Sequence, residues 1–163
     1  MRVLLLLITI FVISCSPSTE KGSKKTRPVV MAYYVAERDY QPTKIPVEKL
    51  THIIYSFTNV IDGEMKFRNP ETAGLKLKQL VEQKSRNPEL KVMIACGGWG
   101  ADDFSDMALT PESRDKFIQS AFEFVEEYQL DGIDIDWEYP GISGAGTMAR
   151  PEDKENFTQV MKG

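Results

Sequence analysis

The sequence contains a single histidine, His52, among its 163 residues. One histidine excludes a metal site built from two or more histidines. It also leaves little room for a Ser-His-Asp mechanism, because His52 lies inside the apolar segment 51–55 and is better interpreted as a structural residue. Cysteine is almost as scarce, since Cys15 and Cys96 are the only two that could form a disulfide.

Positive charge is also limited. Lys and Arg number 20 against 24 Asp and Glu, which gives a formal net charge of -4. No stretch combines Lys or Arg with interleaved aromatic residues, so nucleic acid is excluded as an expected partner. A mildly acidic surface is compatible with a neutral substrate but does not identify one.

The sequence has no apolar run long enough to span a bilayer. Residues 3–13 are apolar apart from Thr9, and this run is much shorter than the roughly 20 residues that a transmembrane helix needs. Such a run near the N-terminus is typical of a signal peptide. It ends in Val12-Ile13-Ser14-Cys15, which resembles a bacterial lipobox.

The lipobox resemblance implies that residues 1–14 are a lipoprotein signal peptide and that Cys15 is lipidated after cleavage. Residues 15–27 would be a flexible tether, and the expected location is the bacterial cell envelope, at the periplasmic or cell-surface side of a membrane that Cys15 anchors. The alternative is an ordinary secretory signal that contains a cysteine. Lipidation of Cys15 would leave Cys96 without a disulfide partner, as a small buried apolar residue.

The remaining chain alternates between short apolar runs and amphipathic segments. Four β-rich runs are predicted strands: residues 29–35, 52–60, 91–96 and 130–137. Three segments are predicted helices: residues 71–86, residues 111–128, and a third that begins near residue 151. Alternation of this kind indicates an α/β fold with a parallel sheet and crossover helices.

Apolar spacing predicts which side of each helix is buried. The first helix should bury Leu75, Leu77, Leu80 and Val81. The second should bury Phe117, Ile118, Ala121, Phe122, Val125 and Tyr128. Thr110 is the predicted N-cap of the second helix, with Pro111 at its first position.

The last predicted strand carries an unusual set of acids. Asp134, Asp136 and Glu138 are two residues apart, so they share one face at roughly 6 to 7 Å per step. Three enclosed carboxyl groups repel one another, which raises and couples their pKa values and favours retention of one proton. A carboxyl group that is protonated near neutral pH can act as a general acid.

Two alternatives remain for these acids. The strand could be an exposed edge strand with a charged outer face. It could also bind a divalent cation, although stacked positions on one strand do not readily supply six or more oxygen ligands around one ion. We therefore predict no metal site.

Residues 131–138 match every fixed position of the DxxDxDxE pattern of family 18 glycoside hydrolases, and Trp137, Tyr139 and Pro140 match its chitinase-type form, DGxDxDWEYP. The runs near residues 30–34, 51–57 and 91–99 also resemble the first three strands of that family. The resemblance implies a (β/α)8 TIM barrel of which only about the first four βα units are present. Residues 28–163 would then be the N-terminal half of a truncated catalytic barrel.

The resemblance also implies roles for individual residues. Glu138 would be the catalytic acid, Asp136 would orient the acetamido group of the substrate, and Asp134 would share a proton with Asp136. Asp131 is the first residue of the motif. The implied substrate-binding residues are Tyr33, Phe57, Trp99, Tyr139, Gly97 and Gly98. No cofactor is implied.

The implied function is hydrolysis of β-1,4-linked N-acetylglucosamine polymers, chitin or chito-oligosaccharides, by retaining, substrate-assisted catalysis. Two alternatives are an endo-β-N-acetylglucosaminidase that acts on the chitobiose cores of N-glycans and a non-catalytic, chitinase-like lectin. One departure from the family is notable. Ala95 occupies a position where the family usually has a serine that hydrogen-bonds the inner aspartate, so we expect an altered pH dependence rather than inactivity.

Overall fold

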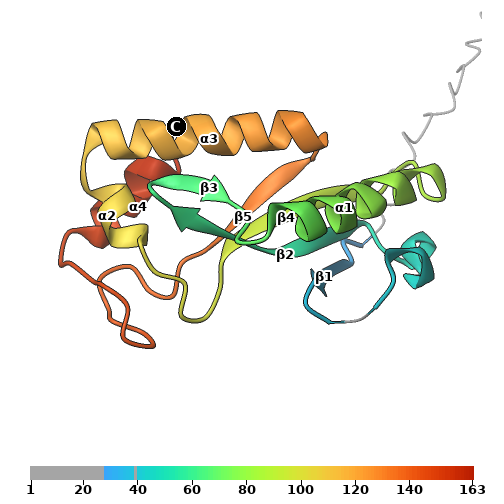
Figure 1. Cartoon of the computed structure of the whole chain (residues 1–163), viewed down its shortest axis with the longest axis horizontal. Helices are drawn as coiled ribbons and strands as arrows, with labels where there is room; N and C mark the ends of the chain where they lie inside the picture. The colour runs from blue at the N-terminus through green and yellow to red at the C-terminus, as the bar shows by residue number, and fades with distance from the viewer. Residues whose placement is uncertain (1–27, 39) are drawn as a thin grey trace, which may run out of the picture.

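The computed structural model describes residues 28–38 and 40–163 (Figure 1). Its main sheet contains β1 (Met31–Val35), β2 (His52–Ile61), β4 (Lys91–Gly97) and β5 (Gly132–Asp136), which are parallel and lie in the order β1-β2-β4-β5. A short strand, β3 (Glu64–Lys66), pairs antiparallel with the end of β2. The signal-peptide, tether and lipidation predictions for residues 1–27 lie outside the described residues.

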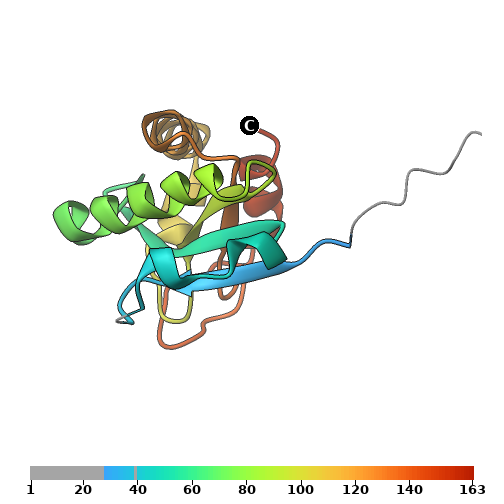
Figure 2. The same cartoon turned by 90° about the vertical axis from the view of Figure 1, so that its right-hand side faces the viewer.

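Helices connect the parallel strands on one side of the sheet. The helix α1 (Pro70–Val81), extended by the 3-10 turn η3 (Glu82–Ser85), joins β2 to β4. The helices α2 (Phe104–Leu109) and α3 (Pro111–Tyr128) join β4 to β5, and α4 (Asp153–Val160) follows β5. Two further 3-10 turns, η1 (Pro42–Lys44) and η2 (Val47–Lys49), lie between β1 and β2. Figures 1 and 2 show α1 and α3 side by side over the same face of the sheet.

This arrangement confirms the predicted fold class, because consecutive parallel strands with crossover helices on one face are the repeating unit of a (β/α)8 barrel. The described strands form part of such a barrel. Within the described residues, no helix is sufficiently long and apolar to span a membrane.

The start of α3 follows the sequence prediction. The Thr110 hydroxyl accepts a hydrogen bond from the Ser113 backbone N–H at 3.1 Å, and the Ser113 hydroxyl accepts one from the Thr110 N–H at 3.1 Å. This reciprocal pair satisfies two backbone donors that a helix N-terminus leaves free. Pro111 has no backbone N–H, so the first position of the helix needs no hydrogen-bond acceptor. At the other end, Gln129 terminates the helix in the left-handed conformation at φ 55°.

The hydrophobic core lies between the sheet and the helices. The strands contribute Ile53, Val92 and Ile94, and the helices contribute Leu77, Leu80 and Phe117, all essentially inaccessible to solvent. Burial of each such side chain contributes about 1.5–3 kcal/mol to folding. The next residues along the strands, including Ile54 and Ala95, belong to the opposite face of the sheet, as the two-residue period of a strand requires.

Some predicted details were wrong. Leu75 and Phe122 are exposed. Leu75 lies away from the sheet, whereas Phe122 borders an open apolar groove beside β5. The α-helical part of the first predicted helix ends at Val81 instead of continuing to residue 86. Neither β3 nor α2 was predicted.

Candidate active site

The acidic residues of β5 lie on the face of the sheet that the helices do not cover. Ile133 and Ile135 pack against the helix-side core, and the intervening Asp134 and Asp136 take the opposite face. Trp137 is buried on the helix side, stacked on Phe104 with a centroid distance of 5.5 Å. Asp134, Asp136 and Glu138 are each partly buried.

Asp134 is hydrogen-bonded across the sheet. The Tyr33 hydroxyl, from β1, donates to Asp134 Oδ2 at 2.7 Å, although β2 and β4 lie between their two strands. A side chain can span that distance only where the sheet curves, so this face is the concave interior of the partial barrel. The hydrogen bond to Asp134, together with burial and the charges of Asp134 and Asp136, raises the pKa of Tyr33 to about 12.

The three carboxyl groups interact. Burial raises the pKa of Asp136 above its ordinary value, and the nearby charges of Glu138 and Asp134 raise it further. This is the coupling that the spacing predicted, and it makes Asp136 a group that binds a proton more readily than a free aspartate. Retention of a proton on Glu138 stays a prediction.

Tyr139 extends this acidic cluster. A hydrogen bond with the Glu138 carboxyl group and its charge raise the pKa of the Tyr139 hydroxyl. The peptide bonds Glu138–Tyr139 and Ser56–Phe57 are both cis, the first after the end of β5 and the second within β2.

Four predicted aromatic residues lie on segments next to the acids. Trp99, Tyr33 and Tyr139 are 68%, 58% and 46% exposed, and Phe57 is half-buried. Exposed rings beside a carboxylate cluster are suited to stacking against the apolar faces of sugars. Trp99 and Tyr139 follow the carboxyl ends of β4 and β5, where barrel enzymes bind substrates. Tyr33 lies in the middle of β1, and its hydroxyl reaches Asp134.

Gly97 and Gly98 have a packing role. Gly97 adopts φ +123°, and a Cβ atom there would lie 2.1 Å from the Asp136 carbonyl oxygen. The Gly98 N–H donates to that same oxygen at 2.8 Å, and the Phe57 ring contacts Gly98. Only glycine permits the turn after β4 to approach the acidic strand so closely. That these glycines also contact substrate stays a prediction.

Asp131 lies directly before β5, at the opposite end of the strand from Asp136 and Glu138. Its carboxylate accepts a hydrogen bond from the Val92 backbone N–H at 2.8 Å and forms ion pairs with Lys84 at 2.6 Å and Lys91 at 3.1 Å. Burial opposes the charge of Asp131, but these three donors outweigh it and lower its pKa below the ordinary value. The first acid of the motif is therefore a structural residue that joins β4 to β5.

A buried polar network behind the site was not predicted. Asp153 is fully buried at the start of α4 and accepts hydrogen bonds from the Ser105 hydroxyl and the Arg150 N–H, both at 2.7 Å. It also accepts one from the Gly141 N–H at 3.4 Å, and the Arg150 guanidinium reaches the Ser105 hydroxyl and Asp106. The Asp153 carboxylate is thus hydrogen-bonded to the first and the last residue of the loop 141–150. A carboxylate two residues after Pro151 was the only sequence signal for it.

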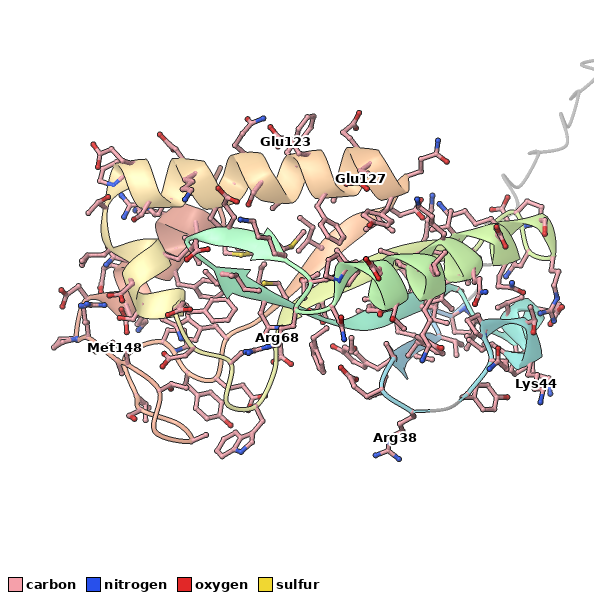
Figure 3. All side chains as sticks on the ribbon, viewed as in Figure 1. Arg38, Lys44, Arg68, Glu123, Glu127 and Met148 are labelled. Atoms are coloured by element: carbon pink, nitrogen blue, oxygen red, sulfur yellow. The ribbon has the colours of Figure 1, made fainter. Side chains whose placement is uncertain are left out.

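The same loop is held to the turn after β4. The Met148 N–H donates to Asp102 Oδ1 at 3.1 Å. Figure 3 shows Met148 on this loop. Gly144 lies against the Glu138 carbonyl and the Tyr139 ring. The loop therefore supports the segment that carries both of these residues.

The remaining candidates have structural positions. Cys96 is buried on the helix side, and burial raises the pKa of its thiol to about 12, so it is not a thiolate nucleophile. His52 lies at the amino end of β2, with Nδ1 2.9 Å from the Thr51 hydroxyl. Both positions agree with the interpretation from the sequence.

A parallel sheet whose concave face carries carboxyl groups near the carboxyl ends of its strands defines a (β/α)-barrel site suited to acid catalysis. Residues 29–163 match the family described as "Glycosyl hydrolases family 18". The chain belongs to this family.

Similar proteins agree with that assignment. An endochitinase of Manduca sexta is 34% identical over 161 residues, which cover 91% of this chain and 28% of that protein. The chitinase domain of the spore coat protein CotE from Clostridium difficile is 40% identical, with a TM-score of 0.75, over 88% of this chain and 39% of that structure. A family 18 N-acetylglucosaminidase from Paenibacillus barengoltzii is 37% identical, with a TM-score of 0.71, over 82% and 38%. The chain therefore spans well under half the length of these relatives.

Proposed function

We propose that the protein containing this chain is a glycosidase that hydrolyses β-1,4-linked N-acetylglucosamine polymers, chitin or chito-oligosaccharides, with retention of configuration. The observation that supports this most directly is the concave face on which Tyr33, Asp134 and Asp136 meet, next to Glu138. Relatives described as chitinases provide independent support.

In the proposed mechanism, Glu138 donates a proton to the glycosidic oxygen as the bond between C1 and that oxygen breaks, and the leaving sugar departs as an alcohol. The 2-acetamido carbonyl of the substrate attacks C1 to form an oxazolinium ion. Asp136 accepts a hydrogen bond from the acetamido N–H, which orients the carbonyl oxygen and stabilises the developing positive charge. Asp134 exchanges a proton with Asp136, and the Tyr33 hydroxyl stabilises the ionised form of Asp134. Glu138 then acts as a base toward the water that completes hydrolysis.

Two other functions are weaker candidates. An endo-β-N-acetylglucosaminidase that cuts N-glycan cores would share the three acids, but the Trp137-Glu138-Tyr139-Pro140 segment favours a chitinase. A lectin that binds glycan without cutting it would not require Glu138, which is present and lies beside Asp136.

We also infer that further βα units complete the barrel. On the outer side of β5, Ile133 and Ile135 border an apolar groove whose other walls are Phe117 and Val125 of α3 and Met161. Another strand and helix would cover this groove and pair with the free edge of β5. Residues 28–163 alone are therefore expected to be unstable, and cooperative unfolding of this segment in isolation would contradict the inference.

We propose that Cys15 anchors the protein to a membrane of the bacterial cell envelope. The lipobox-like segment 12–15 supports this proposal. Replacement of Cys15 by Ser should release the protein from the membrane fraction and abolish incorporation of a labelled fatty acid. Retention of the label in the variant would contradict lipidation at this residue.

The enzymatic proposal can be tested with the full-length protein. Release of a fluorophore from a chitobioside is compared with deglycosylation of a glycoprotein, in the wild type and in Glu138→Gln. Loss of the general acid should lower kcat by about 10²–10⁴-fold on the chitobioside. Glu123→Gln is a matched control, because Glu123 projects from the outer side of α3 (Figure 3). Deglycosylation without chitobioside cleavage would favour the endo-β-N-acetylglucosaminidase, and a Glu138→Gln variant as active as Glu123→Gln would refute the acid role.

A further inference from the structure

Arg68 is an exposed arginine that is held in one orientation at the carboxyl end of β2. Its Nε and Nη2 atoms both donate to Asn59 Oδ1, at 3.1 and 2.9 Å. Among residues 28–38 and 40–163, its guanidinium forms no ion pair with a carboxylate and no other hydrogen bond. A guanidinium that is fixed on one edge and has further N–H donors on the other is suited to bind an acceptor from outside the fold.

Asn59, which holds Arg68, faces the concave side of the sheet. Thr58 is buried and pairs with Cys96, a member of the helix-side core, and Val60 belongs to the same core. Because side chains alternate along a strand, Asn59 takes the opposite face. In the view of Figure 3, Arg68 accordingly lies on the side of β2 opposite to α3.

The strand register places Asn59 level with Asp136. Thr58 pairs with Cys96, and Gly97, the next residue of β4, pairs with Asp136 on β5. Asn59 and Asp136 are therefore separated by two strand spacings of about 4.8 Å each, with only a glycine between them. This separation is longer than one sugar ring, so Arg68 lies beside a different sugar unit from the one that Asp136 would orient.

The surface around this row can accept a glycan. Trp99, which follows the turn after β4, is largely exposed, and so is Tyr33 on β1. The neighbouring cation, Lys66, pairs with Asn59 across β3, but its charge is neutralised within the hairpin by Glu64. N-acetylglucosamine offers hydroxyl and acetamido oxygens, which are acceptors that a guanidinium can bind.

We propose that Arg68 binds the glycan at a sugar unit beyond the one that Asp136 orients, by donating hydrogen bonds to a hydroxyl or acetamido oxygen of N-acetylglucosamine. Asn59 is the positioning residue that fixes the plane of the guanidinium. This inference rests on the proposed function, because it extends the binding site of the same enzyme. The contribution of Arg68 then depends on substrate length, since only a glycan that reaches from Asp136 to β2 can contact it.

The test measures kcat/KM of the full-length protein on chito-oligosaccharides from the trisaccharide to the hexasaccharide. Arg68→Ala should lower kcat/KM about tenfold on the hexasaccharide and less on each shorter substrate, because hydrogen bonds from a charged donor are lost. Arg68→Lys keeps the charge but not the planar fork, so its loss should be intermediate. Lys44→Ala is the control, because it removes one positive charge far from Arg68 (Figure 3) and should match the wild type.

A second comparison tests the role of Asn59. Asn59→Ala frees the guanidinium and should give a smaller loss with the same dependence on length. The double variant Asn59→Ala/Arg68→Ala should be no worse than Arg68→Ala, because Asn59 acts through Arg68. A purely structural role would lower the melting temperature and reduce kcat/KM equally on all lengths. Equal losses on all lengths, or no loss in a folded Arg68→Ala variant, would overturn the inference.

Binding without turnover separates this inference from the proposed function. Calorimetry with the hexasaccharide compares Glu138→Gln with Glu138→Gln/Arg68→Ala, and the affinity should fall about tenfold. A wild type that cleaves no chito-oligosaccharide would refute the proposed function, whereas this fall in affinity would still support the contact with Arg68. Unchanged affinity, or no binding to either protein, would overturn it. If Arg68→Ala does not fold, Arg68→Lys and Asn59→Ala take its place in both measurements.

Discussion

Replacement of Asp131 tests whether the first acid of the motif acts on stability alone, separately from the catalysis proposed for Asp134, Asp136 and Glu138. Asp131→Ala removes the acceptor of the Val92 N–H, a hydrogen bond to a charged group that contributes about 1.5–3 kcal/mol. It also removes the ion pairs with Lys84 and Lys91, whose side chains are 29% and 55% exposed, so solvent screening limits each pair to about 0.5 kcal/mol. The free energy of unfolding should therefore fall by about 2–4 kcal/mol.

Asp131→Asn is the matched variant. Its amide oxygen can still accept from Val92, so the expected loss is about 1–2 kcal/mol. The lowered pKa of Asp131 stabilises the fold above its unfolded-state pKa of about 4, and this contribution disappears as the pH falls through the folded-state pKa. The difference in free energy of unfolding between the wild type and Asp131→Asn should therefore decrease below about pH 4.

Urea unfolding of the full-length protein from pH 3 to pH 7 measures both effects, and kcat on the chitobioside is measured where all variants are folded. Because Asp131 lies at the amino end of β5, kcat should stay within about threefold of the wild type. A large fall in kcat together with unchanged stability would refute the reasoning, since it would place Asp131 in the catalytic machinery.

Two further changes test the surroundings of the acids. Tyr33→Phe removes the 2.7 Å donor to Asp134, so kcat should fall about tenfold and the acidic limb of its pH profile should move upward; an unmoved limb in steady-state assays would contradict this role. Asp153→Asn breaks the buried network with Ser105 and Arg150, and urea unfolding should show a loss of about 2–4 kcal/mol. The same variant should raise KM because the loop behind Tyr139 loosens, whereas a normal KM with normal stability would exclude a supporting role.

The placement of the acids could be predicted because a strand has a period of two. Asp134 and Asp136 share a face because the neighbouring Ile133 and Ile135 are apolar, whereas Glu138 lies two residues beyond the end of β5. The cap of α3 was equally predictable, since Thr110 and Pro111 act through local backbone geometry. Interactions between residues a few positions apart can be predicted from their spacing in the sequence.

The contacts that depend on tertiary structure could not be predicted. Asp153 and Ser105 are 48 residues apart, and nothing in either segment indicates that they will meet. The exposure of Phe122 depends on what covers the apolar groove beside β5, which apolar spacing alone does not specify. The functional assignment of Asp131 also required the structure, because its partner Lys84 lies in a different βα unit.

The close approach of Gly97 and Gly98 to the Asp136 carbonyl has a consequence for how the proposed glycosidase could diversify. Trp99 follows two residues after Gly97, so the offset between the main chain that carries Trp99 and β5 depends on main-chain contacts. No replacement of side chains can lengthen or shorten that offset without breaking the turn. We therefore expect new glycan preferences of the proposed glycosidase to arise through exposed side chains of the loop 141–150, such as Ile142 and Met148.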